Sequence, residues 1–61
     1  MTKFEIKQVD NITLHVKLGN ITAAALGLSS LIRCARTTKS QTQLREVAEL
    51  LNLINHPDFI C

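Results

Sequence analysis

Aromatic residues are almost absent from this 61-residue chain, which has two phenylalanines, no tyrosine and no tryptophan. A core without large rings must be built from aliphatic side chains, so we expect leucine, isoleucine, valine and alanine to fill it. The same scarcity removes the stacking platforms on which single-stranded nucleic acids are usually held. At this length the chain forms one domain, residues 1–61, whose stability is marginal unless oligomerisation supports it.

Cysteines are also few. Cys34 and Cys61 are too sparse for a disulfide scaffold, and no secretion signal precedes the first patterned segment. We therefore expect a reducing, cytoplasmic setting in which both thiols stay free. Together with His15 and His56 they are metal-ligand types, but no pair of them has the spacing of a zinc site. No metal or other cofactor is expected.

The sequence lacks a long apolar run. Its most apolar stretch, residues 21–32, is shorter than the roughly 20 residues that cross a bilayer, and Gly27, Ser29 and Ser30 interrupt it. A net charge of +2 is too small to indicate nucleic acid or a membrane surface by itself. We expect no membrane association.

Catalytic motifs are missing as well. No serine or cysteine stands in a recognisable pattern with a base, and so small a fold offers little room for a walled site. The acidic residues are scattered along the chain, at Glu5, Asp10, Glu46, Glu49 and Asp58. We therefore expect a protein that is not an enzyme.

What the sequence does contain is a strongly apolar central helix, predicted over residues 20–36 with Asn20 as its N-cap. At about 100° per residue one broad stripe forms a core face. The stripe consists of Ile21, Ala24, Ala25, Leu28, Leu31, Ile32 and Ala35.

A second stripe of this helix carries small side chains, with Leu26 just beyond it. We interpret it as a self-association surface, because small residues let another backbone approach closely and a short chain has little else to cover it. The alternative is a core helix covered by its own chain. The proposed self-association residues are Ala23, Leu26, Gly27, Ser30 and Cys34.

Two N-terminal segments alternate apolar and polar residues with period two, residues 3–8 and 12–18. Such alternation predicts half-buried strands. A three-residue loop, residues 9–11, pairs Ile6 with Leu14 and Phe4 with Val16, and so keeps the apolar side chains on one face. A β-hairpin is therefore predicted.

A second helix is predicted from Ser40, where Ser40 and Gln43 have capping-box spacing, to a stop at His56–Pro57. Its inner face is expected to hold Leu44, Val47, Ala48, Leu51 and Ile54, while Leu50 and Leu53 widen the apolar sector into a partner-binding contact. The predicted fold is α+β, a β-hairpin followed by two antiparallel helices (ββαα), completed by oligomerisation.

The expected function is that of a small regulator or inhibitor, of a bacterium or phage, that binds a protein partner through an apolar helical surface and works as a homodimer or higher oligomer. One alternative is a nucleic-acid-binding regulator, for which residues 22–36 hold a partial helix-turn-helix pattern. Its anion-binding residues would be Arg33, Arg36, Lys39 and Arg45. A third is a small-ligand sponge with sites between protomers.

Overall fold

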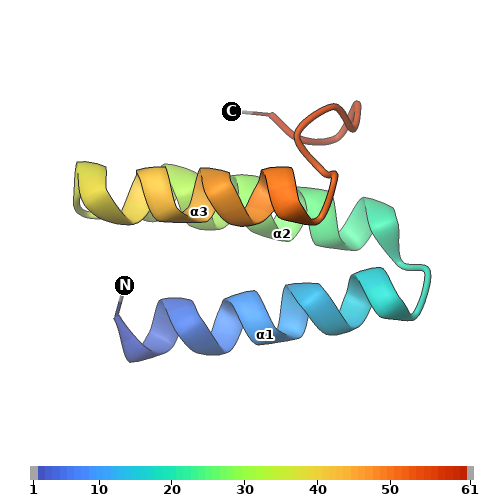
Figure 1. Ribbon diagram of the computed structural model, residues 1–61, viewed down its shortest axis with the longest axis horizontal. Coiled ribbons are helices and arrows are strands. Elements are labelled where there is room, and N and C mark those ends of the chain that lie inside the picture. The colour runs from blue at the N-terminus through green and yellow to red at the C-terminus, as the bar shows by residue number, and fades with distance from the viewer. Residues whose placement is uncertain (1, 61) are drawn as a thin grey trace.

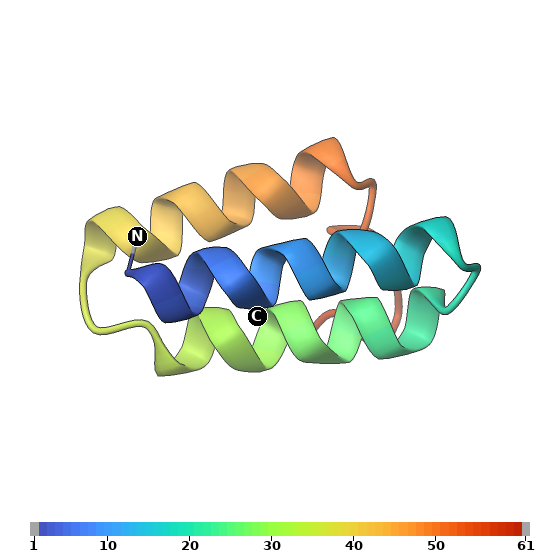
Figure 2. The same cartoon turned by 90° about the horizontal axis from the view of Figure 1, so that it is seen from below.

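Three helices and a C-terminal tail make up the part of the chain that the computed structural model describes, residues 2–60. Helix α1 spans Lys3–Lys17, α2 spans Ile21–Cys34, and α3 spans Thr38–Leu50. Helices α2 and α3 lie antiparallel, α1 runs along one face of that pair, and the tail crosses the other face (Figures 1 and 2). No strand occurs within residues 2–60, so the predicted α+β, ββαα fold is wrong and the fold is all-α.

The predicted hairpin is one continuous helix, α1, because both of its ends are capped. The Thr2 hydroxyl accepts from the Glu5 N–H at 3.2 Å, and Glu5 Oε1 accepts from the Thr2 N–H at 2.9 Å, a reciprocal capping box. At the other end Gly19 has a φ of +84°, which glycine adopts without a steric penalty. The Asn20 N–H then donates to the His15 carbonyl at 2.8 Å, closing a Schellman motif.

The period-two alternation gave a wrong prediction because the apolar residues that alternate in this segment are mostly exposed on α1. The side chains that face the core follow a helical period instead, with Glu5 and Ile12 buried and Val9 and Val16 packed beside them. A buried carboxylate within that stripe hides its helical character. Several residues assigned to the buried hairpin face point to solvent: Phe4, Ile6, Leu14 and Leu18.

Helix α2 matches its prediction more closely. Asn20 is the N-cap, although its side chain makes no capping bond and its amide nitrogen lies 3.5 Å from His15 Nδ1. The helix ends at Cys34, two residues before the predicted limit. Five residues of the predicted core face are buried, as the periodicity indicated: Ala24, Ala25, Leu28, Leu31 and Ile32.

Helix α3 begins and ends earlier than predicted. Thr37, rather than Ser40, is its N-cap, and the Thr37 hydroxyl accepts from the Ser40 N–H at 3.1 Å. The helix stops at Leu50 because Asn52 adopts a left-handed φ of +59° and the Leu53 N–H returns to the Ala48 carbonyl at 2.8 Å. The proline therefore does not end it.

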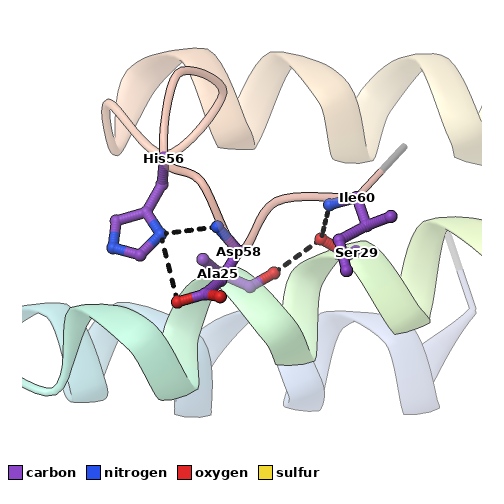
Figure 3. Close-up of polar contacts among 5 residues, drawn as sticks. All are labelled: Ala25, Ser29, His56, Asp58 and Ile60. Atoms are coloured by element: carbon purple, nitrogen blue, oxygen red, sulfur yellow. Dashed lines mark hydrogen bonds and ion pairs between the residues drawn. The ribbon is translucent and has the colours of Figure 1, made fainter.

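The tail, residues 51–60, closes the core on the side opposite α1. Leu53 is 1% exposed and Phe59 packs against the same cluster. The Ile60 N–H donates to Ser29 Oγ at 2.9 Å, and that hydroxyl donates to the Ala25 carbonyl at 2.7 Å (Figure 3). The buried apolar core consists of Ile12, Ala24, Ala25, Leu28, Leu31, Ile32, Leu44, Ala48 and Leu53.

Substitutions in α1 can distinguish a helix from a hairpin in this segment. A hairpin would bury both Ile12 and Leu14 on one face, whereas the helix buries Ile12 and exposes Leu14. Ile12→Val is expected to lower the free energy of unfolding by about 1 kcal/mol. Leu14→Ala is expected to change it by less than about 0.5 kcal/mol. Urea denaturation of both variants measures the difference, and a larger loss for Leu14→Ala would contradict the helix.

Candidate functional site

A groove of about 440 Å³ runs between α1 and α2 on the outer side of the bundle. The α2 side contributes small residues for most of its length, and the α1 side contributes polar residues around one phenylalanine. From α1 the lining residues are Phe4, Gln8, Asn11, Ile12 and His15. From α2 they are Ala23, Gly27, Ser30, Leu31 and Cys34.

The groove exists because α2 carries almost no side-chain bulk on this flank. A Cβ built at Gly27 would meet Ile12 Cγ1 at 3.7 Å and Ile12 Cδ1 at 3.9 Å, so Ile12 leaves room for one methyl group at this position. Positions 23, 27, 30 and 34 recur on one flank of the helix. The small-residue stripe of the sequence is therefore one side of this groove.

Exposed leucines and a phenylalanine border the groove. Leu26 follows Ala23 by three residues and precedes Ser30 by four, so it lies on the solvent side of the stripe, 45% exposed. Leu18, the C-cap of α1, follows His15 by three residues, and Phe4 lines the groove itself. Leu14 lies slightly further round α1. Of these apolar residues the sequence interpretation assigned only Leu26 to the surface.

The groove continues into a hollow of about 510 Å³ at one end of the bundle, and Phe4, Leu31 and Cys34 line both. Glu5 also lines this hollow. Its Oε1 accepts from the Thr2 N–H, whereas its Oε2 is buried and accepts no hydrogen bond from the described residues. The Thr2 N–H is the main reason that the pKa of Glu5 lies below its ordinary value; burial opposes the effect.

The structure separates the two leucines that were predicted to form a partner contact. Leu50 is 85% exposed on α3, whereas Leu53 is 1% exposed and belongs to the core beneath the tail. The separation arises because the helix ends at Leu50 and the left-handed Asn52 turns the following residue inward. Neither residue lines the groove.

The four predicted anion-binding residues are spread over the α2 C-terminus, the loop and α3. Arg36 lines the hollow beside Thr37 and Ser40, and none of the four lines the groove. Arg33, Lys39 and Arg45 are exposed. Residues 21–34 form one continuous helix, so the partial helix-turn-helix pattern has no turn in this structure.

The groups that most often carry chemistry do not converge. Cys34 is an exposed free thiol that lines the groove and the hollow, and Cys61 lies outside the described residues. His56 Nδ1 accepts from the Asp58 N–H at 3.1 Å and lies 3.8 Å from Asp58 Oδ2, while Ser29 holds the tail (Figure 3).

Within residues 2–60 no three histidine, cysteine or acidic side chains come together as metal ligands would. Over the same residues, no helix combines the length and apolar character needed to cross a bilayer.

Gly27→Ala is expected to stabilise the chain. The new methyl group meets Ile12 at ordinary contact distance, and alanine improves on glycine in a helix by about 1 kcal/mol. Thermal unfolding should show a rise of roughly 4–8 °C in Tm for so small a domain. Gly19→Ala is the matched control and should lower Tm, because its φ of +84° strains a side chain. A fall in Tm for Gly27→Ala would contradict the packing.

Comparison of the chain with protein-family models, with curated proteins and with solved structures gives no match.

Proposed function

We propose that the chain is a non-enzymatic binding protein that acts by burying its α1–α2 surface against another protein chain. We define this surface as the groove together with Leu14, Leu18 and Leu26. By covering the matching surface of its partner, the bound chain regulates or blocks that partner. A reducing compartment such as the cytoplasm suits this role, because Cys34 borders the groove as a thiol.

The observation that carries the proposal is the balance between buried and exposed apolar side chains. Six apolar residues larger than alanine are buried: Ile12, Leu28, Leu31, Ile32, Leu44 and Leu53. Six more pack half-buried against them: Val9, Val16, Ile21, Val47, Leu51 and Phe59. Eight large hydrophobic side chains are exposed: Phe4, Ile6, Leu14, Leu18, Leu26, Leu50, Ile54 and Ile60. Isolated exposed leucines are ordinary, but three of these eight border one groove with Leu14 close by, and a grouped apolar surface is typical of an interaction site.

The bundle face that holds this surface is close in size to one side of a small interface. The two longer dimensions of the bundle are 29 and 21 Å. A face of those dimensions covers about 600 Å², which approaches the roughly 800 Å² that each partner contributes to a stable interface. The groove adds further area because its walls as well as its rim can be covered.

Site-specific photocrosslinking tests the proposal. p-Benzoylphenylalanine in place of Leu26 reports on the groove rim, and the same residue in place of Thr42 reports on the exposed surface of α3. On irradiation in extract, the Leu26 position should give a discrete adduct and the Thr42 position should not. The adduct mass distinguishes a second copy of the chain from another protein.

Gly27→Leu in the same experiment should reduce the adduct about tenfold, because a leucine on the groove floor excludes the partner. Circular dichroism and thermal unfolding establish that the variant is folded. The proposal would be overturned by equal labelling from both positions, or by an adduct at Leu26 that Gly27→Leu leaves unchanged.

A further inference from the structure

The charges are divided unevenly between the first two helices and the rest of the chain. Residues 2–36, which include α1 and α2, expose five basic side chains and one acidic side chain: Lys3, Lys7, Lys17, Arg33 and Arg36, against Asp10. Residues 37–60 carry two basic and three acidic side chains: Lys39 and Arg45, against Glu46, Glu49 and Asp58. The small net charge of the chain therefore conceals an excess of basic residues on α1, α2 and the loop after α2.

Two of these basic residues flank the groove directly. Lys7 follows Phe4 by three residues and precedes Asn11 by four, and both of those residues line the groove. On the other side Arg33 follows Ser30 by three residues and Leu26 by seven. The groove consequently has an apolar and small-residue interior with a cation on each rim. Glu5 is the other acidic residue of α1, but it is buried and is therefore not counted among the exposed charges.

We propose that the α1–α2 surface binds an acidic amphipathic helix of another protein, an inference that rests on the proposed function and names its partner. Two antiparallel helices leave a groove into which the side-chain ridge of a third helix packs. Leucine-sized side chains of the partner fill the space above positions 23, 27 and 30, which the small residues leave open. Glutamates on either side of that apolar ridge meet Lys7 and Arg33.

A second copy of the chain satisfies this surface less well. A two-fold contact brings the same surface of both copies together, so the cationic rims of one copy face those of the other. The acidic residues Glu46 and Glu49 lie on α3, and pairing them with Lys7 and Arg33 of the next copy gives a head-to-tail contact that does not close.

The groove shape also argues against the two other anionic partners. A bilayer surface is flat on this scale and leaves a groove of 440 Å³ unfilled. Nucleic acid is held through phosphate contacts, yet apolar side chains are exposed beside this groove: Phe4, Leu14, Leu18 and Leu26.

Fluorescence anisotropy with two matched peptides tests the proposal. Each is an 18-residue helix of about 27 Å, close to the 29 Å length of the bundle, with leucines on one stripe and either glutamate or lysine beside it. The glutamate peptide should bind in the micromolar range, about tenfold more tightly than the lysine peptide. Its affinity should fall several-fold as salt rises from about 50 to about 500 mM.

Charge-reversed variants locate the contact. Lys7→Glu combined with Arg33→Glu should invert the preference between the two peptides. Lys39→Glu combined with Arg45→Glu makes the same change in net charge away from the groove and should leave the preference intact. Equal affinity for both peptides would overturn the proposal, as would inversion by the control pair. Duplex DNA or anionic vesicles that bind through Lys7 and Arg33 in place of the peptide would also overturn it.

The outcome separates the two proposals. If neither peptide binds but the Leu26 photocrosslink still depends on Gly27, the surface is an interface and the acidic helix is the wrong partner. If the crosslink is also lost from the groove, the proposed function fails with it.

Discussion

The contact between α1 and α2 beside Gly27 is the feature on which the groove depends. Ile12 is the α1 residue buried in the core, and it lies over a position of α2 that has no side chain. A larger residue there would fill the groove floor. The glycine weakens α2 by about 1 kcal/mol relative to alanine, and in return it keeps the groove open. The residue that keeps the groove open is therefore one that lowers the stability of its helix.

The tail complements this arrangement from the other side of the bundle. The α2–α3 pair has two faces, and α1 covers only one of them (Figure 2). Leu53 and Phe59 close the other side, and the Ile60 N–H fixes the tail to Ser29 Oγ. No residue of the described tail lines the groove, so the tail leaves the α1–α2 surface open.

The sequence predicted α2 well because a buried helix displays its period in uncharged residues such as Ala24, Leu28 and Ile32. Helix α1 was misread because Glu5 stands in its core stripe and because Phe4, Ile6 and Leu14 alternate by chance on exposed positions. Two boundary signals were nevertheless present in the sequence. Thr2 and Glu5 have capping-box spacing, and Gly19 is placed to end a helix that begins there.

The candidate site was predictable only in part. Four small residues of α2 share one flank, and their spacing alone identified the stripe. The α1 wall of the groove could not be predicted, because residues such as Gln8 and His15 line the groove only when this segment is a helix. Leu53 could not be placed from the pattern either, since the left-handed Asn52 changes which leucine turns inward.

The central claim is that the single chain leaves its α1–α2 surface uncovered, and methyl NMR with a soluble paramagnetic probe tests it most directly. At low protein concentration the methyl groups of Leu14, Leu18 and Leu26 should be strongly broadened. Those of Ile12, Leu28 and Leu44 should be protected by the core. Protection of Leu14, Leu18 and Leu26 to the same degree as the core methyl groups would contradict the account.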